Sequence, residues 1–212
     1  GVVIHTDAAQ SVGKIRVNVR ELDVDCLSVA GHKLYAPQGV GALYLRRGTP
    51  FAPMLRGAGH QQNRRSGTES VALSAALGAA CALLSRESES SREHLRAMRD
   101  RLEQKLREAF PSLVVHGAEA KRLPNTLYAA FPGLDANELL ARLDGVATGT
   151  GAACHSGKAD PSKVLLAMGV KADIARATLR LTTGRPTTAR EIDDAAARIV
   201  EAVKAGAGSA SA

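Results

Sequence analysis

Two charged residues, each placed after a short apolar run, are the first candidates for chemistry. Lys33 comes soon after the mostly apolar run 26–30, and Asp7 comes soon after the run 2–4, with Gln10 three residues further on. A lysine amine can condense with an aldehyde, and a carboxylate can hold a protonated ring nitrogen. Together, Lys33 and Asp7 favour a cofactor that carries both an aldehyde and a basic ring nitrogen.

Pyridoxal phosphate has both groups, so it is the cofactor that this pair predicts. A carboxylate at Asp7 would keep the ring nitrogen protonated, so that the cofactor could draw electrons from a substrate carbon. The alternative interpretation is that a lysine after a short apolar segment merely carries a solvated charge at a strand end. Further motifs along the chain favour the first interpretation.

Several separated motifs occur in an order that resembles the cysteine desulfurases of the class V aminotransferase group, with the selenocysteine lyases as close relatives. The motifs are the stretches 5–10, 28–47, 65–69 and 149–157, and the resemblance runs from about residue 1 to 203. It implies an α/β protein with the pyridoxal phosphate-dependent transferase (aspartate aminotransferase-like) fold. The expected architecture is a partial large domain followed by a smaller C-terminal α+β domain.

The resemblance also implies the cofactor contacts. Lys33 would form the Schiff base with the cofactor aldehyde, Asp7 would pair with the pyridine nitrogen, and Gln10 would bond to the ring hydroxyl. His32 would bind the cofactor phosphate. Thr68 would reach the phosphate of the neighbouring subunit in a homodimer.

Two nearby positions add to this expectation. The residue two before His32 is often a phosphate-binding serine in the family, and here it is Ala30. His60 lies in the glycine-containing loop 56–62, where backbone amides could approach a phosphate. The family has a similar glycine-rich segment near its active site, so His60 is a further candidate.

A second constellation surrounds a single thiol, Cys154, in the stretch of small residues 149–157. Glycines on both sides suit a nucleophile that must approach a substrate and then withdraw. By the resemblance, Cys154 attacks the sulfur of the substrate and leaves as a persulfide. His155 and Lys158 are candidates to favour the thiolate. The family often has threonine at position 155, and the histidine here is more similar to the selenocysteine lyases.

Arg180 is the candidate for binding the substrate carboxylate. It lies in the stretch 176–188, which predicts a strand followed by a turn, and a guanidinium can bind a carboxylate through two hydrogen bonds. The pattern alone leaves Arg176 and Arg185 nearly as good, since arginines in an alternating strand often face water. The family pattern selects Arg180.

The implied function is a pyridoxal phosphate-dependent cysteine desulfurase that converts L-cysteine to L-alanine. Its persulfide would pass to an acceptor, such as an iron–sulfur scaffold protein, for iron–sulfur cluster or thio-cofactor assembly. A selenocysteine lyase would use the same parts, whereas a transaminase would have no use for Cys154. A non-catalytic dimerisation or binding module is the third alternative, against which the intact Lys33, Asp7, Gln10 and Cys154 count.

Composition limits the partners and the location. The net charge is +7, but the basic residues are spread along the chain and aromatics make up only 3%, so we expect no nucleic acid partner. No apolar stretch is long enough to cross a bilayer, so we expect no membrane association. The odd number of cysteines predicts a reducing cytoplasm.

Cys26 and Cys81 are interpreted as small buried hydrophobes, and His94 and His116 as surface residues. No set of cysteines and histidines has the spacing of metal ligands.

Short apolar runs alternate with helical patterns, which is typical of an α/β protein. The polar junction 85–91 predicts a boundary between the C-terminal part of the cofactor-binding large domain (1–85) and the small domain with the cysteine loop (86–204). Residues 205–212 are predicted to be a disordered tail, and the chain is predicted to be the latter part of a longer protein. The patterns predict strands at 2–5, 26–29, 41–45, near 114, at 127–131 and 177–181, and helices at 71–84, 92–109, after Asp135 and after Thr188.

Overall fold

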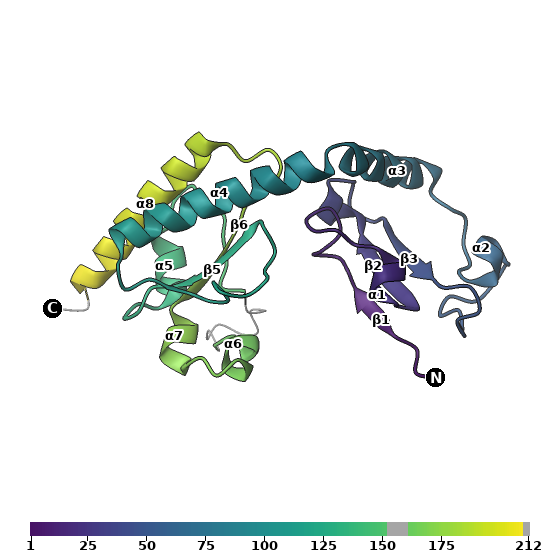
Figure 1. The fold of residues 1–212 in the computed structure, drawn as a ribbon, viewed down its shortest axis with the longest axis horizontal. Coiled ribbons are helices and arrows are strands. Elements are labelled where there is room, and N and C mark those ends of the chain that lie inside the picture. The colour runs from purple at the N-terminus through teal and green to yellow at the C-terminus, as the bar shows by residue number, and fades with distance from the viewer. Residues whose placement is uncertain (152–160, 210–212) are drawn as a thin grey trace. The chain divides into compact units, whose positions relative to one another are not determined.

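The computed structural model describes residues 1–151 and 161–209 (Figure 1). The chain divides into two compact units, Gly1–Arg92 and Glu93–Ala212. Each unit has its own three-stranded sheet.

The first unit is built around a sheet with the strand order β1-β2-β3. Strands β1 and β2 are parallel, with His5 opposite Cys26, and β3 returns antiparallel to β2. The helix α3 lies against the short 3₁₀ helix η1. The elements of this unit are β1 (His5–Asp7), α1 (Val19–Leu22), β2 (Cys26–Ala30), η1 (Gly31–Leu34), β3 (Gly41–Leu45), α2 (His60–Asn63) and α3 (Val71–Arg86).

The first strand is not where its apolar residues predict it. The expected strand 2–5 is replaced by β1 at His5–Asp7, and the side chain of Val2 is 89% exposed. A strand is defined by its hydrogen-bonded neighbour, and the pairing with β2 begins only at His5. The prediction for residues 2–4 is therefore wrong, and Asp7 lies inside the strand as its last residue.

The buried core of the first unit is small. Its cluster contains Ala8, Val24 and Leu27, with a few partly buried neighbours that include Val29 and Tyr44. Helix α3 has no fully buried residue, and Cys81 within it is exposed, while Cys26 is half-buried. The prediction of a buried Cys81 is wrong because no further layer of the described chain covers that side of α3.

The second unit has an antiparallel sheet with the order β4-β5-β6. Helices α4 and α8 run side by side along it (Figure 1). Leu127 of β5 pairs with Leu181 of β6, and both point into a cluster shared with the two helices. The elements are α4 (Ser88–Ala109, which begins before the division), β4 (Val114–Val115), β5 (Thr126–Ala130), α5 (Ala136–Arg142), α6 (Lys163–Ala167), α7 (Ala172–Arg176), β6 (Thr178–Thr182) and α8 (Ala189–Ser209).

Two further predictions about helices need correction. Helix α3 continues to Arg86 and α4 begins at Ser88, so the helices predicted at 71–84 and 92–109 both extend into the polar junction 85–91. The predicted disorder from residue 205 is wrong for residues 205–209, which continue α8. Gly206 is buried there, and a Cβ on it would lie 2.9 Å from the Arg142 guanidinium, so the absence of a side chain lets α8 pack closely.

Neither a membrane span nor a metal cluster is evident in the described parts of the chain. No single described helix is long and apolar enough to cross a membrane, and α3 with α4 meets those criteria only as a bent pair, by length and composition. In residues 1–151 and 161–209, no three histidine, cysteine, aspartate or glutamate side chains are grouped so that they could hold a metal ion.

Candidate active site

The parallel pairing of β1 with β2 brings Asp7 and Lys33 to one edge of the sheet. Asp7 is the last residue of β1, and Lys33 lies in η1, which directly follows β2. Because the strands run parallel and Asp7 pairs with Ser28, both strands end at the same edge. In α/β proteins, ligand sites form at the carboxyl ends of the strands. The two residues that the sequence singled out therefore share the edge where a cofactor would be expected.

Gly31 makes the direct turn from β2 into η1 possible. A Cβ at this position would lie 2.6 Å from the carbonyl oxygen of Val40. The Gly31 N–H donates to the same oxygen at 2.9 Å. Tyr35 then ends η1 in the left-handed conformation, with φ 67°. A larger residue at position 31 would push away the backbone that presents Lys33.

Local hydrogen bonds orient the Asp7 carboxylate. The backbone N–H of Ala9 donates to Asp7 Oδ1 at 2.9 Å, at the start of the turn that contains Gln10. On the same face of the sheet, His5 Nε2 and Ser28 Oγ are hydrogen-bonded at 2.8 Å. Asp7 and Gln10 are both exposed, so their polar atoms are accessible to a ligand.

His32 and Lys33 are also exposed, and an unpredicted residue, Lys14, belongs to the same region. Lys14 Nζ is buried and has no hydrogen-bond partner among the described residues. Burial holds the pKa of Lys14 below its usual value, and the positive charge of Lys33 lowers this pKa further. Lys14 could have been proposed from the sequence because it lies four residues after Gln10 and directly after Gly13.

That glycine packs the turn before Lys14 tightly against the rest of the unit. Gly13 has φ +77°, a conformation that favours glycine. A Cβ on it would lie 3.0 Å from Leu84 of α3 and 3.2 Å from Leu34 of η1. Since Leu34 adjoins Lys33 in η1, this packing holds the turn before Lys14 close to the element that carries Lys33.

Thr68 and His60 lie in the irregular region between β3 and α3. Thr68 is exposed, and the loop before it is tied by Ser66 Oγ, which donates to the Ala58 carbonyl at 2.8 Å. His60 Nδ1 is buried without a hydrogen-bond partner in the described chain. No hydrogen bond or ion pair between described residues joins Thr68 or His60 to Asp7 or Lys33.

Arg180 lies in the second unit, in the middle of β6. Its neighbours Leu179 and Leu181 are buried, so alternation along the strand turns Arg180 to the other face, where it is exposed. Among the described residues, no carboxylate forms an ion pair with its guanidinium. Arg176 ends α7 and Arg185 lies beyond β6, so Arg180 is the one of the three candidates that lies within the strand.

The segment that leads to Cys154 is bonded to Arg180. The Arg180 N–H donates to the Gly149 carbonyl at 2.6 Å, and Thr148 Oγ1 donates to the Arg180 carbonyl at 2.8 Å. The two residues Gly149 and Arg180 form an antiparallel bridge. Cys154, His155 and Lys158 lie outside the described residues, which end at Gly151 on this side.

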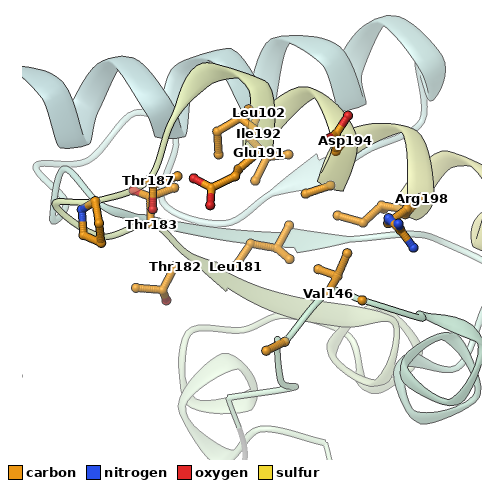
Figure 2. A pocket seen from close by; sticks show the side chains of 15 residues that line it. Leu102, Val146, Leu181, Thr182, Thr183, Thr187, Glu191, Ile192, Asp194 and Arg198 are labelled. Atoms are coloured by element: carbon orange, nitrogen blue, oxygen red, sulfur yellow. The ribbon is translucent and has the colours of Figure 1, made fainter.

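A cavity of about 560 Å³ in the second unit lies between α8 and residues 145–147 (Figure 2). Its described lining includes none of the site residues that the sequence predicts. Glu191 accepts hydrogen bonds from the N–H and the hydroxyl of Thr188, and Arg198 Nη1 donates to the Asp144 carbonyl at 3.0 Å. Because Glu191 and Arg198 are already hydrogen-bonded to the chain around α8, this cavity is a poor candidate for a polar ligand.

Comparison with known proteins identifies the family. Residues 1–194 match the family described as aminotransferase class-V. The chain belongs to this family. It is 42% identical over 195 residues to a cysteine desulfurase of Gluconacetobacter diazotrophicus, covering 91% of this chain and 49% of that protein. It is 44% identical over 202 residues to the selenocysteine lyase of Bos taurus, covering 91% and 46%.

Solved structures show the same relationship. A NifS-like protein matches with a TM-score of 0.84 and 29% identity, covering 95% of this chain and 52% of that chain. These matches confirm the expected fold, a partial pyridoxal phosphate-dependent transferase (aspartate aminotransferase-like) fold. The chain spans about half the length of the curated relatives that it matches.

Proposed function

We propose that this class V aminotransferase acts as a pyridoxal phosphate-dependent cysteine desulfurase, which converts L-cysteine to L-alanine and carries the sulfur as a persulfide on Cys154. The observation that carries the proposal is the bridge between Gly149 and Arg180. It joins the segment that leads to the nucleophile to the residue that would bind the substrate carboxylate. A transaminase would have no use for such a connection.

The groups at the edge of the first unit's sheet fit pyridoxal phosphate. Lys33 offers an exposed amine just after β2, and Asp7 offers an exposed carboxylate at the end of the adjacent parallel strand β1. Position 31 has no space for a Cβ, which would meet the Val40 carbonyl oxygen, so the close turn that presents Lys33 requires a glycine. The chemical types match as well, since an amine suits the aldehyde and a carboxylate suits the pyridine nitrogen.

Each of these residues has a defined task. When bound, pyridoxal phosphate supplies an electron sink for the substrate α-carbon. Lys33 holds the cofactor and takes the proton of the α-carbon onto Nζ. Asp7, whose Oδ1 is already oriented by the Ala9 N–H, keeps the ring nitrogen protonated. Gln10 bonds to the ring hydroxyl, and His32 binds the phosphate.

Arg180 and Cys154 act on the substrate itself. The Arg180 guanidinium binds the carboxylate of L-cysteine, since it has no competing carboxylate among the described residues. The Cys154 thiolate attacks the substrate sulfur. A new S–S bond forms while the bond between sulfur and the β-carbon breaks, and the β-carbon takes the electron pair and then a proton, which gives alanine. The terminal sulfur then passes to an acceptor such as an iron–sulfur scaffold protein.

The proposal extends to the assembly. Residues 1–85 are assigned to the large cofactor domain and 86–204 to the small domain with the cysteine loop. Thr68, which is exposed, reaches the cofactor phosphate of the neighbouring subunit in a homodimer. The location that we propose is the cytoplasm.

A selenocysteine lyase is the second candidate function. The 44% identity to the bovine selenocysteine lyase favours it directly. The same residues would serve L-selenocysteine, with selenium in place of sulfur as the departing atom. The two functions differ in whether L-cysteine is turned over.

Substrate assays with matched variants test the proposal. The protein with its full chain is supplied with L-cysteine or L-selenocysteine, and alanine is measured together with sulfide or selenide. We expect Cys154→Ala to abolish turnover of L-cysteine, and Cys81→Ala, at the exposed cysteine of α3, to retain it. Turnover of L-selenocysteine alone, or turnover of L-cysteine that survives Cys154→Ala, would establish the lyase instead.

Reduction with borohydride tests the cofactor assignment independently of turnover. A link between Lys33 and the cofactor aldehyde becomes permanent on reduction and is located by peptide mass spectrometry. We expect the label on Lys33, and none in Lys33→Ala. An unlabelled Lys33 in the cofactor-treated wild type would favour a non-catalytic dimerisation or binding module.

A further inference from the structure

Tyr128 of β5 lies directly opposite Arg180, the residue proposed to bind the substrate carboxylate. It is the cross-strand partner of Arg180, so the two side chains leave the same face of the sheet. The Tyr128 hydroxyl donates to the carbonyl oxygen of Thr150 at 3.1 Å. Three consecutive residues on the way to Cys154, namely 148, 149 and 150, are therefore hydrogen-bonded to this one strand pair.

The backbone at Gly151 lies close to the phenol ring of Tyr128. Gly151 has φ +74°, and a Cβ on it would lie 3.0 Å from Tyr128 Oη. A side chain at position 151 would therefore be strained by its backbone conformation and crowded by the hydroxyl. The hydroxyl of Tyr128 and the backbone of Thr150 and Gly151 fit together as one contact.

The ring of Tyr128 is itself held in place by His116. The two rings meet edge to face, with centroids 5.5 Å apart. His116 Nε2 and Thr178 Oγ1 lie 3.0 Å apart, and Thr178 donates its own proton to the Ile174 carbonyl. His116 Nε2 is therefore the donor to Thr178. His116 was predicted to be a surface residue, but it is half-buried, and this burial lowers its pKa.

We propose that Tyr128 is a positioning residue, whose hydroxyl fixes the chain before Cys154 relative to Arg180. The proposal rests on the desulfurase function proposed above and adds a residue to it. Arg180 is held by the β5–β6 ladder whether or not the hydroxyl is present. Loss of the hydroxyl should therefore misplace the nucleophile while leaving the binding of the substrate carboxylate almost unchanged.

The test is Tyr128→Phe in the protein with its full chain, because it removes the hydroxyl and keeps the ring against His116. We expect kcat for alanine formation from L-cysteine to fall about tenfold, the effect of losing one hydrogen bond at the reacting geometry. KM should stay within about twofold, since Arg180 keeps its place. The matched control is Tyr44→Phe in β3, for which both constants should stay within about twofold of the wild type.

A second measurement is independent of turnover. Hydrogen exchange at the amides of residues 148–151 should become about tenfold faster in Tyr128→Phe, while the amides of β5 and β6 keep their protection. An unchanged kcat, or unchanged exchange at residues 148–151, would overturn the proposal. A uniform loss of protection across the second unit would also overturn it, because Tyr128 would then have a purely structural role. If the wild type does not turn over L-cysteine, the exchange result still decides whether Tyr128 holds this segment, while the desulfurase proposal fails by itself.

Discussion

The two units of the chain differ in how much buried apolar side chain supports their sheets. Among the described residues, the second unit has one cluster of buried leucines, alanines, isoleucines, a phenylalanine and a valine that joins β5, β6, α4 and α8. The first unit has only Ala8, Val24 and Leu27 fully buried in its cluster, and Met54 is 92% exposed. Arg180 therefore lies on a strand, β6, that packs against the large buried core of the second unit. Asp7 and Lys33 are held mainly by strand pairing and tight turns.

The two units also treat charge differently. In the second unit, Asp193 of α8 accepts from both nitrogens of the Arg101 fork at 2.7 Å, and Lys105 lies 3.2 Å away. In the first unit, Lys14 Nζ is buried without a partner in the described chain. Charged side chains join elements in both units, since Arg46 after β3 pairs with Asp23 and Asp25 before β2, but the first unit also keeps the Lys14 charge unpaired near its proposed cofactor site. A thin core and an unpaired charge are costs of stability that functional regions often carry.

The largest expected effect comes from truncating a core leucine in each unit. Leu179→Ala removes a completely buried side chain from the large cluster and should lower the free energy of unfolding of the second unit by about 3 kcal/mol. Leu27→Ala should cost the first unit about 2 kcal/mol, because its sparse surroundings can close more of the cavity. Hydrogen exchange of β6 and β2 peptides in increasing denaturant measures the two effects separately.

The control for this pair is Leu43→Ala, since Leu43 is 47% exposed on the first unit's sheet. It should change stability by about 0.5 kcal/mol or less. A cost for Leu27→Ala equal to or above that for Leu179→Ala would contradict the contrast between the two cores.

A smaller effect is expected for the unpaired lysine. Lys14→Met keeps most of the length and an apolar stem but removes the charge, so it should stabilise the first unit by about 1 kcal/mol at neutral pH. The folded state lowers the pKa of Lys14 from 10.5, so the wild type should gain stability as pH rises toward 10.5, and the variant should lack this gain. Exchange protection of β2 at pH 7 and at higher pH measures both effects. Lys14→Arg keeps the charge and should give no stabilisation. A lower stability of the first unit in Lys14→Met would contradict the cost assigned to the buried Lys14 charge.

The smallest effect concerns the charge pairs of the second unit. Arg101 first, and Lys105 after it, lower the pKa of Asp193 from 3.8 to about 2. Because the folded pKa lies below the unfolded one, the pairing contributes stability above pH 3.8 and loses it as pH falls to about 2. Asp193→Asn should remove this part of the acid dependence. Thermal unfolding followed by circular dichroism from pH 5 to pH 2 measures it, and identical acid profiles would show that the exposed pairing contributes nothing.

Features that depend on neighbouring residues were predictable. Gly31 directly precedes His32 and Lys33, and the structure shows why a glycine stands there, since a Cβ at position 31 would meet the Val40 carbonyl. Thr188 and Glu191 predicted the start of the last helix, and their reciprocal hydrogen bonds confirm it. The place of β1 and the exposure of Cys81 were predicted wrongly, because apolar composition does not reveal which neighbour pairs with a strand or covers a helix.

The sequence by itself determined the family and the chemical types of the candidate residues, because both are carried by short motifs, each made of residues a few positions apart. The tertiary structure alone decided that Asp7 and the turn bearing Lys33 share a sheet edge, that Lys14 is buried near them, and that Tyr128 and Arg180 hold the segment before Cys154. Strand register, burial and these hydrogen bonds join residues far apart in the chain. They arise only when the separate elements pack together, and no local pattern encodes them.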